Sequence, residues 1–196
     1  MYKKFISAVA LSALTLSTFA VDSQMWISAA NFLWSKGIIA SNLQSPDLYR
    51  LNDTITRKEM MKIVTKLAWA TPDDSCLWKF QDVGKDWWCK YIERALKVWF
   101  ISANKKFRPD DNITEAEAIK LIFKARGLTK SVDTGNWQND YLASALDLGM
   151  VHDNPNSSME APSTDASRGW IFYASAQTFV EFKNGNGNKV MSDEAL

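Results

Sequence analysis

The side chains with the most specific chemistry in this sequence are two cysteines, Cys76 and Cys89, and a single histidine, His152. Two thiolates and one imidazole fall short of the four ligands of a tetrahedral zinc site. In an oxidising compartment, two cysteines at a short separation favour a disulfide, which would stabilise the fold by about 3 kcal/mol. We therefore expect a Cys76–Cys89 bond, and a metal site is the alternative.

Catalytic motifs are missing from the sequence. It contains no Gly-x-Ser-x-Gly, Walker or His-Glu-x-x-His pattern. Asp110, Asp111 and Asn112 resemble the start of a calcium loop, but the Gly and the closing Glu of that loop are not at the required spacing. They suit the turn before a helix better. We expect no enzymatic activity, no cofactor and no metal.

Hydroxyl and carboxyl side chains recur at a spacing that opens helices. Thr56 and Thr114 are each followed three residues later by a glutamate, Glu59 and Glu117. In such a capping box the hydroxyl and the carboxylate each accept a backbone N–H that the first helical turn leaves unpaired. Ser167 keeps only the hydroxyl half. These glutamates are therefore predicted to be structural and not acid–base catalysts.

Apolar residues recur at helical spacing before and after each box, in three copies. The stripe that starts at Trp88 recurs from Trp26 and from Gln138, and each second helix has an apolar face of its own. Short amphipathic helices are marginal alone, so the copies must pack together. We predict an all-α fold of three helix-loop-helix repeats in a pseudo-threefold bundle. The best-preserved stripe is Trp88, Tyr91, Ile92, Ala95, Leu96 and Trp99.

The repeats divide the chain into five predicted parts. These are a signal peptide at 1–20, repeats at 21–72, 76–130 and 131–182, and a polar tail at 183–196. Lys3 and Lys4 precede an apolar run that ends in small residues at Ala20, as in a secretory signal. A membrane anchor is the alternative, but the run is shorter than a membrane span requires. We expect a secreted protein with no membrane span after cleavage.

The charge balance bears on the possible partners. The chain has 23 Lys and Arg against 22 Asp and Glu, and removing Lys3 and Lys4 leaves 21 against 22. A formal charge near −1 argues against electrostatic binding to nucleic acid.

The repeat resembles the S-layer homology domain. The second copy has that family's Phe80, Asp82, Trp88, Ala95, Phe107, Pro109, Thr114 and Glu117, and the first copy has the fullest helix-opening box, Ile55-Thr56-Arg57-Lys58-Glu59. The resemblance implies a module that attaches non-covalently to an anionic cell-wall polysaccharide, often a pyruvylated one, at the cell surface or S-layer. Other surface-layer proteins are the second implied class of partner.

The resemblance also suggests ligand-binding residues. Thr56 with Arg57, and Ser167 with Arg168, would meet a carboxylate at the first turn of a helix, where unpaired N–H groups and the helix dipole favour an anion. Trp87 would contact a sugar ring from the solvent side. Arg57 is predicted to make the strongest site and Arg168 a weaker one.

The second copy departs from this pattern, since Glu115 stands where the other copies have arginine, and Gly169 and Trp170 replace part of the third box. An alternative function follows from these departures: a structural or protein-interaction component of a surface assembly whose glycan sites have decayed. A secreted hydrolase is a third possibility, with no motif in its favour.

Trp99 aligns with Gly37 and Gly149, at a helix end where glycine accepts the left-handed conformation. One interpretation is that the second copy ends its helix differently and buries the indole. The other connects this position with nine Trp and only eight Gly in the chain. The source cell would then read UGA as glycine, so that some residues written as tryptophan are glycine.

Overall fold

The structure, a computed structural model, describes residues 23–40, 49–77, 79–151 and 162–182. The predicted signal peptide, Trp78, His152 and the tail lie outside these residues. The described part is helical, with isolated β-bridges but no strand, which confirms the all-α prediction. Residues 23–35 form the first helix, followed by α2 (Arg57–Leu67), α3 (Cys89–Lys97), α4 (Glu115–Arg126), α5 (Trp137–Asp147) and α6 (Arg168–Ala176).

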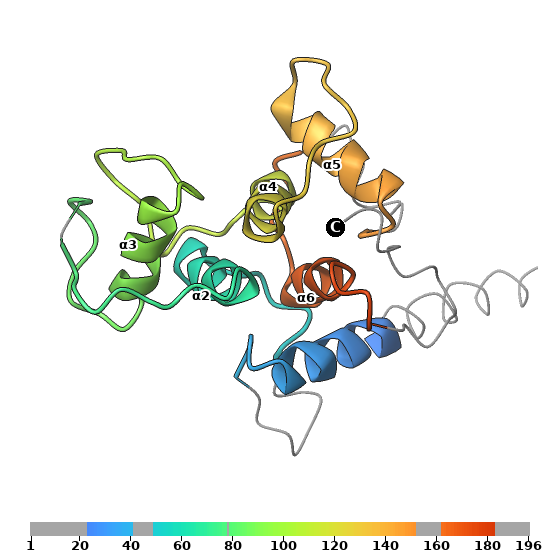
Figure 1. The fold of residues 1–196 in the computed structure, drawn as a ribbon, viewed down its shortest axis with the longest axis horizontal. Helices are drawn as coiled ribbons and strands as arrows, with labels where there is room; N and C mark the ends of the chain where they lie inside the picture. The colour runs from blue at the N-terminus through green and yellow to red at the C-terminus, as the bar shows by residue number, and fades with distance from the viewer. Residues whose placement is uncertain (1–22, 41–48, 78, 152–161, 183–196) are drawn as a thin grey trace, which may run out of the picture.

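Three inner helices, α2, α4 and α6, gather at the centre of the molecule (Figure 1). The segments that lead into them are joined by a closed ring of backbone hydrogen bonds. Ile55 N–H donates to Ala166 O (3.2 Å), Ala166 N–H to Ile113 O (2.9 Å), and Ile113 N–H to Ile55 O (3.0 Å). The three side chains are at most 1% exposed. This cyclic bonding gives the centre a pseudo-threefold arrangement.

Each outer helix packs against an inner helix of a neighbouring copy. Helix α3 lies beside α2, α5 beside α4, and the first helix beside α6, which brings the two ends of the described chain together (Figure 1). Phe32 meets Phe179 with ring centroids 5.3 Å apart. Gly169 leaves room for the indole of Trp26, because a Cβ there would lie 2.3 Å from the ring. No copy therefore packs as a unit on its own.

The inner helices begin where the boxes predict. Thr114 Oγ1 accepts Glu117 N–H and Ser167 Oγ accepts Trp170 N–H, both at 3.3 Å. At α2 the capping box closes more tightly on the acid, since Thr56 N–H and its hydroxyl donate to Glu59 Oε2 at 2.9 and 2.8 Å. These contacts fix the first residue of each inner helix.

The first-helix stripes are buried only in part. Trp88, Tyr91, Ile92 and Ala95 are buried, but Trp99 is 81% exposed. The interpretation that the second copy ends its helix differently and buries this indole is therefore wrong. Among the described residues, no helix is long and apolar enough to cross a bilayer.

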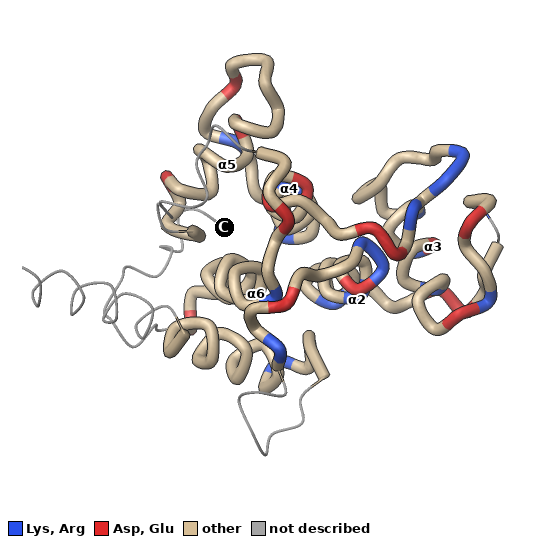
Figure 2. Tube along the Cα trace, turned by 180° about the vertical axis from the view of Figure 1, so that it is seen from behind, with Lys and Arg blue, Asp and Glu red and all other residues tan. Residues whose placement is uncertain are grey.

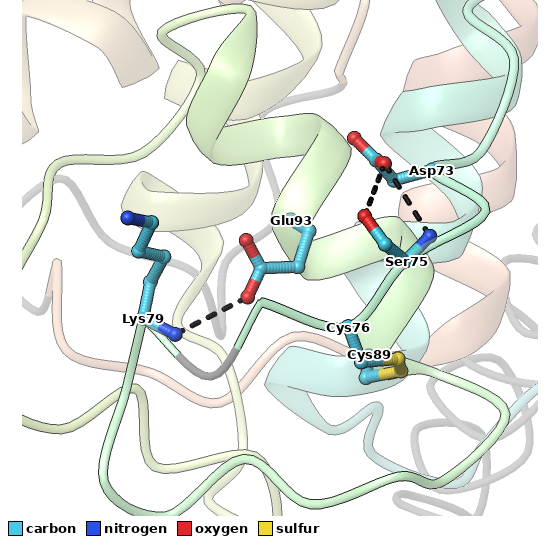
Figure 3. Close-up of a disulfide and its surroundings, with 6 residues drawn as sticks. All are labelled: Asp73, Ser75, Cys76, Lys79, Cys89 and Glu93. Atoms are coloured by element: carbon cyan, nitrogen blue, oxygen red, sulfur yellow. Dashed lines mark hydrogen bonds between the residues drawn. A yellow bond between two sulfur atoms is a disulfide. The ribbon is translucent and has the colours of Figure 1, made fainter.

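The predicted disulfide is present between Cys76 and Cys89, with Cα atoms 5.6 Å apart (Figure 3). It ties the loop after α2 to the first residue of α3. The same loop is held at Glu93, a carboxylate only 1% exposed that accepts Lys79 N–H at 3.3 Å. The disulfide thus supports the packing of α3 against the rest of the bundle.

Candidate functional site: two related grooves

The first of two grooves lies where three copies meet around Arg57, and we name it the Arg57 groove. It has a volume of about 220 Å³ and places Arg57, Glu117, Lys120 and Trp137 on its walls. Lys120 Nζ lies 4.2 Å from the ring centroid of Trp137, a cation–π contact. Beside Arg57, the groove therefore offers the Lys120 cation and an aromatic face, that of Trp137, which is 38% exposed.

The second groove, which we name the Arg168 groove, repeats this arrangement with residues from other copies. It also measures about 220 Å³ and is lined by Arg168, Glu59, Lys62 and Trp87. Lys62 Nζ lies 5.3 Å from the ring centroid of Trp87, which is 52% exposed. Each residue stands at the repeat position of its counterpart in the Arg57 groove, so the two grooves are equivalent by the internal repeat.

The third position of the repeat has none of these four residues. Glu115 replaces the arginine, Trp170 the glutamate, Tyr173 the lysine and Met25 the tryptophan. All four residues are at least 93% buried, so the position is filled rather than open. In the sequence, Glu115 of the second copy and Trp170 of the third copy are separate departures from the repeat. Both belong to this third position.

Each groove arginine pairs with the glutamate of the neighbouring capping box. Arg57 Nη1 lies 2.9 Å from Glu117 Oε1, and its Nε–H donates to Phe107 O at 3.0 Å. Arg168 repeats both contacts, with Glu59 Oε1 at 3.0 Å and Tyr49 O at 3.0 Å. The arginine thus joins one inner helix to the start of the next. In Figure 2 basic and acidic positions adjoin around α2 and the loops that lead into it.

The pairing with Arg168 helps to lower the pKa of the Glu59 carboxylate. Burial by itself would raise its pKa, but hydrogen bonds from the N–H and hydroxyl of Thr56 and the charge of Arg168 outweigh burial. The pKa of Glu59 therefore lies below its ordinary value of 4.5. The glutamate stays ionised at neutral pH and keeps the Arg168 side chain in place.

The first-turn N–H groups are not available to an anion, and the sequence-based expectation that they would hold one is wrong. Arg57 N–H donates to Asp111 O, Glu115 N–H to Thr164 O and Arg168 N–H to Asp53 O, all at 2.9 Å. A carbonyl of the next copy thus takes the place that a ligand would need. Recognition of an anion in these grooves must rest on side chains.

The structure separates the predicted ligand-binding residues into two groups. Arg57, Arg168 and Trp87 line the grooves. The hydroxyls of Thr56 and Ser167 face the helix starts, where they take part in the caps. The role of all five in ligand binding stays a prediction.

The sequence reasoning missed Lys62, Lys120 and Trp137 as groove residues. The signal was present, because the repeat that aligns Thr56 with Thr114 also aligns Lys62 with Lys120, and Trp137 falls on Trp87 in the stripe alignment. No group of three or more His, Cys, Asp and Glu in the described residues could hold a metal ion.

Comparison with known protein families matches residues 79–119 to the S-layer homology domain. The chain contains an S-layer homology domain. The match covers the loop into α3, α3 itself and the start of α4, including the capping box of Thr114 and Glu117. The first and third copies lie outside the matched residues, so a tandem of three such domains stays a prediction.

Three curated proteins are similar to this chain. They are a middle cell wall protein of Brevibacillus brevis (26% identical over 191 residues, 87% of this chain), a cell surface protein of Thermoanaerobacter kivui (28% over 172 residues, 76%) and an amylopullulanase of Thermoanaerobacterium thermosulfurigenes (30% over 136 residues, 61%). The matched part is 17%, 21% and 7% of these proteins, respectively. The comparisons support the predicted location, secreted and at the cell surface or cell wall.

Proposed function

We propose that the chain anchors to the cell wall by binding an anionic polysaccharide in its two grooves, and that it carries three S-layer homology repeats. The observation that supports this most is the repetition of one quartet, arginine, glutamate, lysine and tryptophan, in both grooves. A carboxylate would lie between arginine and lysine, and a sugar ring would stack on the indole. The ligand class is therefore a polymer whose sugars carry carboxylates, such as pyruvyl or uronate groups.

The two grooves are not equal in charge. The Arg57 groove also contains Lys106 and Lys124, which gives it four basic side chains against one acid. The Arg168 groove has two basic side chains against one acid. Since a carboxylate is drawn to the more positive groove, this supports the sequence-based ranking of Arg57 above Arg168. The third position, with Glu115 and Trp170, is proposed to bind no polymer.

The chain is proposed to act by attachment and not by catalysis. It is similar to only 7% of the amylopullulanase, so the activity in that protein's name gives no reason to expect the same here.

A repeated polymer can engage two grooves at once, and linked contacts strengthen attachment without any new type of contact.

A second candidate function is interaction with another protein of the surface layer. The filled third position favours it, because one of the three repeat positions no longer has the residues proposed to bind the polymer. Such a component would associate with surface proteins and not with the polymer itself.

Co-sedimentation with isolated wall fractions separates the two functions. The chain should sediment with native wall material and remain in solution after the acidic polysaccharide has been removed. Equal sedimentation with both fractions would contradict the proposal and favour a protein partner. The control is Lys105→Ala, which removes an exposed lysine outside both grooves. This variant should sediment like the unchanged protein.

A further inference from the structure

Five helices in the described part end in the same backbone motif. After each helix one residue takes a positive φ: Gly37 at 71°, Trp69 at 53°, Trp99 at 63°, Gly127 at 67° and Gly149 at 64°. The hydrogen bonds match as well. Gly37 N–H donates to Trp34 O at 2.7 Å, and Trp99 N–H donates to Leu96 O at 3.2 Å. Glycine favours this left-handed position because a Cβ would crowd the backbone.

The two tryptophans occupy positions where another copy has glycine. Trp69 aligns with Gly127 at the ends of α2 and α4, and Trp99 aligns with Gly37 and Gly149. The same lysine contact recurs at two of these ends: Lys66 Nζ donates to Gly37 O (2.6 Å) and Lys124 Nζ to Trp99 O (3.0 Å). The five helix ends therefore share one backbone motif, in which the left-handed residue is glycine at three ends and tryptophan at two.

The other described tryptophans stand apart from this pattern. The positions aligned with Trp26, Trp34, Trp87 and Trp137 hold no glycine in any copy, and the glutamates of the capping boxes align with Trp170. None of these residues has a positive φ. Glycine in a related copy and a left-handed backbone thus coincide at positions 69 and 99.

Packing does not account for the two indoles. Trp99 is 81% exposed and Trp69 is 63% exposed, with an edge contact to Phe179 at 6.4 Å. Two arginines, Arg50 and Arg108, also have positive φ, but both copies keep arginine there. The left-handed backbone is strained for tryptophan. The exposed indole is a second unfavourable feature, because it leaves a large apolar surface in water.

We propose that positions 69 and 99 are glycine in the protein that the source cell makes, because that cell reads UGA as glycine where the written sequence has tryptophan. Both unfavourable features then disappear, since glycine accepts the conformation and leaves no exposed indole. The tryptophans of the two grooves, Trp87 and Trp137, are unaffected. The change would raise the number of glycines in the chain from eight to ten.

Peptide mass spectrometry of the protein isolated from its own cells tests this directly. Peptides that span positions 69 and 99 should have the masses of glycine, and peptides that contain Trp87 and Trp137 should have the masses of tryptophan. The gene should have UGA at codons 69 and 99 and UGG at codons 87 and 137. Tryptophan in either of the first two peptides, or UGG at either codon, overturns the proposal.

Stability of the recombinant chain gives a second readout. Trp69→Gly and Trp99→Gly should each raise the melting temperature, because they relieve the left-handed backbone. Trp34→Gly is the matched control: this indole is also partly exposed, but it lies inside the first helix with negative φ, so glycine there should lower the melting temperature. A lower melting temperature for Trp69→Gly and Trp99→Gly would contradict the structural argument.

Discussion

Arg57 and Glu117, which are 60 residues apart in the sequence, form an ion pair of 2.9 Å that joins the start of α2 to the capping box of α4. The arginine side chain is only 17% exposed. The pair therefore links the packing of two inner helices to the wall of a groove. Arg168 and Glu59 repeat it at the next junction.

The pair should contribute to stability as well as to binding. Arg57→Ala should lower the free energy of unfolding by about 1–2 kcal/mol, because it leaves Glu117 and the carbonyl of Phe107 without this partner. Arg50→Ala, whose arginine is 68% exposed, is the control and should lower it by less than about 1 kcal/mol. Urea unfolding measures both. Equal effects would show that the partly buried Arg57–Glu117 pair stabilises the fold no more than an exposed pair does.

The helix caps can be tested one by one. Thr114→Ala and Ser167→Ala should each lower the free energy of unfolding by about 1 kcal/mol, since the first turn loses its hydroxyl acceptor. Thr56→Ala should have a similar effect through loss of the contact with Glu59. Thr71→Ala, at an exposed loop position, should change it by less than about 0.5 kcal/mol. Neutral results at all three caps would refute the assigned helix starts.

The disulfide should stabilise the exported protein. Replacing Cys76 and Cys89 together by serine should lower the free energy of unfolding by about 3 kcal/mol and leave the helical content unchanged. Alkylation followed by mass analysis without reductant should find no free thiol in the exported chain. Two alkylated cysteines there would be inconsistent with the bond.

Acid should weaken the junction at Glu59. Its pKa is lowered in the folded protein, so its contribution to stability is present above the ordinary value of 4.5 and is lost as the pH falls below it. In Glu59→Gln this part of the acid sensitivity should be absent, because glutamine does not titrate. Melting temperatures measured across this pH range compare the two proteins. Identical pH profiles would show that Glu59 does not carry the effect.

Local features of the fold were predictable from sequence because they depend on near neighbours. The hydroxyl and glutamate at Thr56 and Thr114 satisfy N–H groups within one helical turn, so the starts of α2 and α4 follow from a few residues. The disulfide followed from composition and compartment.

The pairing of helices could not be predicted in this way. Nothing local shows that α3 packs on α2, or that Phe32 meets Phe179 near the other end of the chain. The grooves could not be predicted for the same reason, since Arg57, Lys120 and Trp137 come from three different copies. The expectation of open N–H groups at the helix starts failed for a related reason: carbonyls of another copy, such as that of Asp111, fill them.

The central claim is that two grooves, and not three, bind an acidic wall polysaccharide. The most direct measurement is calorimetric titration with an acidic oligosaccharide prepared from the wall. We expect two sites on each chain. Lys62→Ala or Lys120→Ala alone should leave one site with unchanged affinity. Both substitutions together should lower the affinity by about tenfold or more, because each groove then loses a charged partner for the carboxylate. Lys105→Ala should bind like the unchanged protein. Binding that is unchanged in the folded double variant, or three equal sites on each chain, would contradict the account.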